Sequence, residues 1–160
     1  FGESAFAENL NVPAAIWLFN NNLNDGSGNG RTLTQSNNPT YDAADKQEGT
    51  HSIRFNGSNQ SVTMPTTGSF LQSAFTQRTI AFWMKSGSNT GNRVVVDAGG
   101  SDDGLAIRLD ANTLFAGVAS NNVRNSISTP YTSTGWNHIA LVYSGNTLRL
   151  FVNGTEVASN

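Results

Sequence analysis

Apolar and polar residues alternate along short stretches of this chain, and each stretch is closed by Gly, Asn, Asp, Ser or Pro. A period of two is typical of half-buried β-strands, and no segment shows the period of 3.6 that an amphipathic helix requires. The pattern predicts strands at Ala15–Phe19, His51–Phe55, Ser61–Met64, Thr79–Lys85, Arg93–Asp97, Leu105–Asp110, Thr113–Ala119, Trp136–Tyr143, Leu148–Asn153 and Thr155–Ala158. About ten short strands favour an all-β, two-sheet antiparallel sandwich.

Two turns are chemically specific. Asn153-Gly154 lies between two strand-like runs, and this dipeptide favours the positive φ angles of a two-residue hairpin turn. Ser144-Gly145-Asn146 has the same character. The last third of the chain is therefore predicted to be a meander of antiparallel strands.

The alternation also assigns side chains to faces, because successive side chains of a strand point to opposite sides. The residues that we expect to be buried are Trp17, Phe55, Ile80, Phe82, Leu141 and Leu150. If three of the strands share a sheet, their opposite faces carry Trp83, Lys85, His138, Arg149 and Phe151. Aromatic rings beside hydrogen-bonding side chains are typical of sugar-binding sites. The alternative is that loops cover this face and the aromatic residues belong to a secondary core.

Composition narrows the range of partners. The 160 residues fit one domain, and a net charge of −2 with singly scattered Arg residues excludes the basic patch that nucleic acid requires. The chain contains no Cys, so disulfides and thiolate zinc sites are excluded. No apolar run approaches the roughly 18 residues of a membrane helix, so we expect no membrane insertion.

Several blocks of the sequence resemble the laminin-G-like and pentraxin-like jelly rolls of the concanavalin-A-like lectin and glucanase superfamily. They are Trp17–Gly30 with its Asp-Gly-Ser-Gly-Asn-Gly loop, Ile53–Ser58, Phe75–Lys85, Gly135–Tyr143 and Leu148–Gly154. The resemblance implies a laminin-G-like jelly roll over residues 14–160, after an N-terminal arm or linker at 1–13.

Relatives of this kind continue beyond the Asn-Gly hairpin with strands that lie beside the first strand. The resemblance therefore implies a jelly roll that lacks its last strands, with an open edge at Ala15–Phe19. Such an edge is a template for pairing with another chain. We expect strand exchange with a neighbouring chain there, and the arm with Phe6 and Leu10 is a candidate donor.

Two loops rich in oxygen ligands predict a calcium site, because Ca²⁺ selects carboxylate, hydroxyl and carbonyl oxygens. The first loop carries Asp25, Ser27 and Asn29, and the second carries Asp97, Asp102 and Asp103. Asp103 resembles the calcium ligand that opens a strand in laminin-G domains. The alternative for both loops is a turn in which Asp and Asn bond the nearby backbone.

Catalysis is not expected. The hydrolases of the superfamily carry paired carboxylates as Glu-x-Asp-x-x-Glu on one strand, whereas the glutamates here are isolated, at Glu3, Glu8, Glu48 and Glu156. The two histidines, His51 and His138, lack metal-ligand spacing. The resemblance implies a non-enzymatic glycan-binding or adhesion module of an extracellular, cell-surface or virion-surface protein, bound to carbohydrate or another subunit. The alternatives are an assembly module of a fibre, capsid or tail and, third, a polysaccharide hydrolase.

Overall fold

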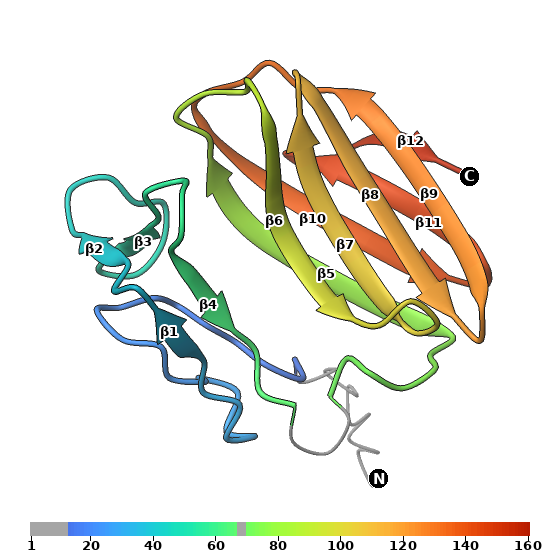
Figure 1. Cartoon of the computed structure of the whole chain (residues 1–160), viewed down its shortest axis with the longest axis horizontal. Helices are drawn as coiled ribbons and strands as arrows, with labels where there is room; N and C mark the ends of the chain where they lie inside the picture. Colours follow the sequence, from blue (N-terminus) through green and yellow to red (C-terminus); the bar gives the residue numbers. More distant parts are fainter. Residues whose placement is uncertain (1–12, 67–69) are drawn as a thin grey trace, which may run out of the picture. The chain divides into compact units, whose positions relative to one another are not determined.

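The computed structural model describes residues 13–66 and 70–160, and these residues form twelve strands and no helix (Figure 1). The strands are β1 (Thr34–Ser36), β2 (Thr40–Asp42), β3 (Ser52–Arg54), β4 (Ser61–Thr63), β5 (Gln77–Lys85), β6 (Asn92–Gly99), β7 (Gly104–Asp110), β8 (Thr113–Ser120), β9 (Val123–Pro130), β10 (Trp136–Ser144), β11 (Thr147–Val152) and β12 (Thr155–Ser159). The predicted all-β, antiparallel jelly-roll class is confirmed. A search of the described residues for a helix long and apolar enough to cross a membrane finds none. The chain divides into two compact units, Phe1–Pro65 and Thr66–Asn160.

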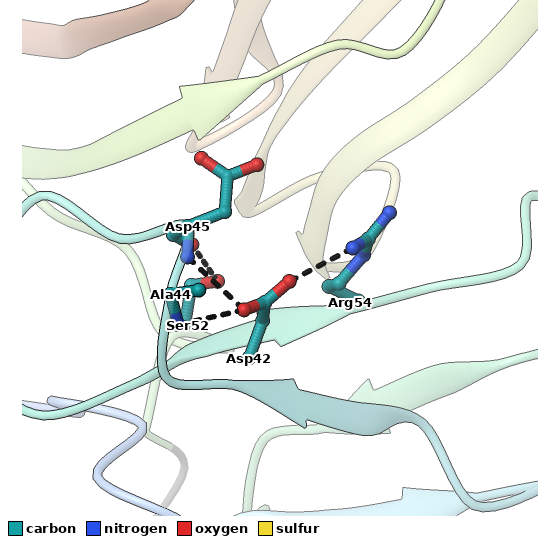
Figure 2. A network of polar contacts seen from close by, with 5 residues as sticks. All are labelled: Asp42, Ala44, Asp45, Ser52 and Arg54. Atoms are coloured by element: carbon teal, nitrogen blue, oxygen red, sulfur yellow. Dashed lines mark hydrogen bonds and ion pairs between the residues drawn. The ribbon is translucent and has the colours of Figure 1, made fainter.

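The first unit is built from two short antiparallel pairs, β1 with β4 and β2 with β3. Asp42, at the end of β2, holds the loop that follows it (Figure 2). Its Oδ1 accepts the backbone N–H groups of Ala44 and Asp45 at 2.8 and 3.0 Å, and its Oδ2 accepts Arg54 Nη1 at 2.8 Å. The backbone hydrogen bonds from Asp45 and Ala44, followed by Arg54, lower the pKa of Asp42 to about 2.

The second unit is a sandwich of two four-stranded antiparallel sheets, with strand orders β12-β11-β10-β5 and β6-β7-β8-β9 (Figure 1). The sheets pack on each other, with β9 against β11 and β12 and with β8 against β11. The side chains that fill the core between them are Ile107, Leu109, Leu114, Ile139, Leu141, Leu148 and Leu150, all fully buried. This continuous aliphatic layer excludes water and stabilises the unit.

The predicted turns of the second unit are confirmed. Asn153 and Gly154 connect β11 to β12 with φ angles of 51° and 79°, and Gly145 and Asn146 connect β10 to β11 with 58° and 66°. Two consecutive positive φ angles give a turn whose twist matches the flanking strands. The local turn chemistry therefore sets the pairs nearest each turn, while a bulge between Leu150 and Phe151 shifts the register farther along β11 and β12.

The predicted alternation of faces is also confirmed. Leu141 of β10 is buried and lies in register with Leu150 of β11 and Ile80 of β5. Lys85, at the end of β5, is exposed on the opposite face. Ile80 and Phe82 point toward the core but are only half-buried, because β5 lies at the edge of the paired strands of its sheet.

The predicted strand at Ala15–Phe19 is wrong, since these residues pair with no strand. Phe19 has a φ of 54°, which interrupts an extended backbone, and the N–H of Ile16 is taken by the Asp25 carboxylate. Strand exchange with a neighbouring chain at Ala15–Phe19 stays a prediction. The arm residues Phe6 and Leu10 lie outside the described residues.

Four of the six predicted core residues are not fully buried: Ile80 and Phe82 on β5, and Phe55 and Trp17 in the first unit. Phe55 is 46% exposed, because β3 ends at Arg54 and the alternation does not extend to the next residue. Trp17 is half-buried, and its Nε1 donates to the Arg31 carbonyl at 2.7 Å. An indole with a polar partner at the surface does not need full burial.

Three strands were not predicted: β1, β2 and β9. Strand β9 reads Val-Arg-Asn-Ser-Ile-Ser-Thr-Pro and so lacks a regular apolar alternation. Its pairing with β8 places Ile127 opposite Ala116, on the inner face, and the neighbouring strand supplies the hydrogen bonds that hold it extended. Tertiary pairing, rather than local propensity, makes this segment a strand.

Candidate functional site

The structure brings the five predicted ligand-binding residues to one face of the sheet β12-β11-β10-β5. Trp83 of β5 lies in register with His138 of β10, while Phe151 and Arg149 of β11 lie in register with Ala140 and Val142 of β10. Directly opposed residues of antiparallel strands point to the same side. Lys85 lies on this side as well, in register with Trp136, which adds a fourth aromatic ring. We call this surface, defined by Trp83, Lys85, His138, Arg149 and Phe151, the aromatic face.

The centre of the aromatic face is an edge-to-face pair of rings. The ring centroids of Trp83 and His138 lie 5.3 Å apart at an interplanar angle of 70°. This geometry is favourable for aromatic quadrupoles and limits the rotation of both rings. Trp83 is 37% exposed, so a large part of the indole can contact a ligand.

A weak surface ion pair borders the aromatic face. Arg149 Nε lies 4.0 Å from Glu156 Oε2 of β12, and both side chains are about half exposed. An exposed ion pair of this length contributes about 0–1 kcal/mol. The Arg149 guanidinium can therefore exchange this contact for a ligand at little cost.

Two asparagines support the aromatic face from behind. Asn137, only 7% exposed, donates through Nδ2 to Ser133 Oγ at 2.7 Å, and its Oδ1 accepts Asn153 Nδ2 at 2.9 Å. Asn153 Oδ1 in turn accepts the His138 backbone N–H at 2.9 Å. Sequence reasoning identified Asn153 as a turn residue and missed this second role, which depends on the proximity of β10 to the β11–β12 turn.

The carboxylate of Asp25 organises the first predicted calcium loop. Its Oδ1 accepts the N–H groups of Ile16 at 3.0 Å and Ser27 at 2.9 Å, and its Oδ2 accepts the Arg31 N–H and Ser27 Oγ, each at 2.9 Å. The backbone bond from Ile16, with those from Ser27 and Arg31, holds the pKa of Asp25 well below its usual range. A carboxylate offers about four acceptor positions, and these four bonds use them.

Asn29 completes the first loop. Its Nδ2 donates to the Ala14 carbonyl at 3.0 Å and to Ser27 Oγ at 3.1 Å. The geometry is that of a self-bonded turn, in which the side chains replace missing backbone partners. A calcium ion here would have to displace several of these bonds.

The second predicted calcium loop borders a shallow cavity of about 390 Å³, lined by Gln72 and residues 99–103. Asp103 Oδ1 accepts the Asn121 N–H at 2.8 Å, and Asp102 Oδ1 accepts Ser101 Oγ at 3.0 Å. Burial lowers the pKa of the Arg78 guanidinium, and the negative charge of the neighbouring Asp103 opposes this shift. Sequence reasoning missed Arg78 as a neighbour of this loop. Within the described residues, no three His, Cys, Asp or Glu side chains are placed to hold a metal ion together.

Residues 56–160 match the family model described as the concanavalin A-like lectin/glucanases superfamily, of the third laminin-G type. The chain belongs to this family. The matched residues include all strands of the sandwich, β5 to β12, and so the whole aromatic face. No curated protein sequence matches the chain significantly.

Solved structures similar to this member of the superfamily include three structures of botulinum neurotoxin binding domains. The receptor binding domain of the C/D mosaic serotype has a TM-score of 0.72 at 14% identity, over 88% of this chain and 36% of that one. The binding domain of neurotoxin DC has TM-scores of 0.62 in a complex with SialylT and 0.61 in a complex with rat synaptotagmin II, each at 14% identity over 91% of this chain and 38% of that one. The chain thus spans a little over a third of the length of these structures, and at such identity the likeness shows the fold.

Proposed function

We propose that this chain is a non-enzymatic glycan-binding module. The observation that carries the proposal is the aromatic face, where Trp83 and Phe151 lie on a rigid sheet beside His138 and Arg149. The apolar face of a sugar ring packs on an aromatic ring, while its hydroxyl groups need hydrogen-bond partners nearby. Residues on paired strands hold such groups in a fixed geometry better than residues on loops do.

The similar structures support a binding function. The binding domain of botulinum neurotoxin DC is described in complex with SialylT in one structure and with rat synaptotagmin II in another. By analogy with these complexes, we propose that this chain binds carbohydrate or another protein. We also propose that it does so outside the cell, or on the surface of a cell or particle. Calcium dependence stays a prediction, with Asp103 as the residue to change, because the Asp25 carboxylate is saturated by its own loop.

The arrangement of carboxylates supports binding over hydrolysis. Glycosidases place two carboxyl groups roughly 5–9.5 Å apart on either side of the scissile bond. Glu156, the glutamate that borders the aromatic face, has Arg149 as its ion-pair partner. The neighbour of this glutamate on the sheet is thus a guanidinium, and not the second carboxyl group that glycoside hydrolysis requires.

A glycan array followed by calorimetric titration of the best ligand tests the proposal. Trp83→Ala and Phe151→Ala should each weaken binding by about tenfold or more, which corresponds to roughly 1.4 kcal/mol of lost stacking. Trp83→Phe should retain part of the affinity because it keeps an aromatic ring.

The matched control is Val94→Ala on β6, where an apolar side chain is 67% exposed on the other sheet. It should bind as the wild type does. No bound glycan on the array, or wild-type affinity in both aromatic variants, would contradict the proposal.

A further inference from the structure

A shallow hollow of about 420 Å³ lies on the outer face of the second sheet, β6-β7-β8-β9, over strands β7, β8 and β9. Two rows of residues in register cross it. One row is Ala106, Gly117 and Ser126, and the other is Arg108, Phe115 and Ser128. The volume falls within the range of about 300–1,000 Å³ that small-ligand sites occupy.

Small residues form the floor of the hollow. Gly117 lies in the middle of β8, with Ala106 on one side and Ser126 on the other. The neighbours Ala116 and Val118 point the other way, into the buried core. A glycine inside a strand often marks a place where a ligand approaches the backbone closely.

The wall of the hollow carries a cation and an aromatic ring. The guanidinium carbon of Arg108 lies 4.7 Å from the centroid of the Phe115 ring. This contact orients the exposed Arg108 side chain over the sheet. Within residues 13–66 and 70–160, no carboxylate forms an ion pair with Arg108.

Two hydroxyl groups complete the set of polar groups. Ser126 and Ser128 of β9 are exposed, and their side chains form no hydrogen bond to any residue of the described chain. Both face the hollow from the same edge. The hollow thus combines an unpaired guanidinium, two available hydroxyls and an apolar ring edge around a flat floor.

We propose that this hollow is a second saccharide subsite, selective for a sugar unit that bears a carboxylate. A guanidinium binds a carboxylate through two parallel hydrogen bonds, which fixes the orientation of the sugar. The Ser126 and Ser128 hydroxyls bond to sugar hydroxyl groups, and the Gly117 floor lets the ring approach the sheet. The inference rests on the proposed glycan-binding function but uses the sheet opposite to the aromatic face.

The test uses three saccharide probes: trigalacturonic acid, its methyl ester, and 3′-sialyllactose. Calorimetric titration of the 160-residue chain should show binding of an acidic probe and at least tenfold weaker binding of the ester, which lacks the charge. Comparison of the two acidic probes distinguishes a uronic acid from a sialic acid as the source of the carboxylate.

Three variants locate the site. Arg108→Gln should weaken the acidic probe at least tenfold, and Gly117→Val should do so by filling the floor. A Cβ at position 117 would meet its nearest atoms at 3.5 and 3.9 Å, which is ordinary contact, so Gly117→Ala is a milder second variant if the valine impairs folding. The charge-matched control is Arg124→Gln at the far end of β9, where Nε donates to the Ser101 carbonyl at 3.2 Å.

The outcomes separate the two proposals. If Arg108→Gln and Gly117→Val (or Gly117→Ala) bind as the wild type does while Trp83→Ala loses affinity, the second subsite is refuted and the glycan-binding function stands. Equal losses in Arg124→Gln and Arg108→Gln would also refute it, because they would indicate a general attraction by positive charge. If the wild type binds no saccharide at all, both proposals fail.

Discussion

Asn153 is a single residue whose substitution tests how the turn supports the aromatic face. Its backbone has a φ of 51°, its Oδ1 accepts the His138 N–H, and its Nδ2 donates to Asn137 Oδ1, with both distances at 2.9 Å. Asn153→Ala removes both hydrogen bonds and places an alanine in the left-handed region. We expect a loss of stability from both the side chain and the backbone.

The structure sets the size of the loss. Alanine at positive φ costs about 1 kcal/mol more than asparagine, which tolerates this region. The hydrogen bond to the His138 N–H is partly solvated and contributes about 0.5–1 kcal/mol, and leaving the Asn137 oxygen without its partner costs about 1–2 kcal/mol. The free energy of unfolding should therefore fall by about 3 kcal/mol.

Urea unfolding followed by tryptophan fluorescence measures this loss as a shift of the midpoint at constant m-value. The matched control is Asn122→Ala, because Asn122 has a φ of 62° while its side chain makes no hydrogen bond within the described residues. It should lose only the backbone part, about 1 kcal/mol. Equal losses in the two variants would refute the reasoning, since the side-chain bonds of Asn153 would then contribute nothing.

Three other predictions concern the core, the acid response and calcium. Leu141→Ala removes a buried side chain that lies in register with Leu150 and Ile80. It should lower the free energy of unfolding by about 3 kcal/mol in the same urea assay. An unchanged midpoint would contradict the assigned core. The pKa of Asp42 is lowered from 3.8 to about 2, so its stabilising contribution is complete above pH 3.8 and is lost as the pH falls through 2. Asp42→Asn should therefore flatten the decline of the melting temperature over this interval, and parallel curves for the two proteins would argue against the pairing. Calcium should raise the melting temperature of the wild type but not of Asp103→Asn, whereas equal values in calcium and EDTA would remove the calcium hypothesis.

The aromatic face could be predicted in part, because strand periodicity assigns each residue to one side of its own strand. Trp83, His138 and Phe151 were assigned to one side from parity, and the register of β5, β10 and β11 places them there. The Asn153-Gly154 turn sets the pairing of Val152 with Thr155, and a bulge between Leu150 and Phe151 then shifts the register of β11 and β12. Local information was sufficient for β10 and β11, which a short turn joins, whereas the pairing of β5 with β10 was a condition of the prediction that the tertiary structure met.

The hollow over Gly117 could not be predicted, since its lining residues come from three strands and carry no motif. Strand β9 lacks an apolar alternation, so neither its existence nor the position of Ser126 and Ser128 follows from the sequence. The signal that was present is Gly117 inside an otherwise regular strand, which often marks close approach of a ligand.

The sequence by itself determined the antiparallel class, the faces of the long strands and the hairpin turns, because these depend on the period-two pattern and on residues that tolerate positive φ. Tertiary structure alone decided that residues 15–19 are not a strand, because Asp25, nine residues beyond Ile16, takes the N–H group that a neighbouring strand would otherwise have bonded. It also decided that β9 is a strand and that Arg108 lies over Phe115, because both depend on which strands become neighbours. Backbone partners that lie far apart along the chain are chosen by the whole fold, and no local pattern of apolar residues encodes that choice.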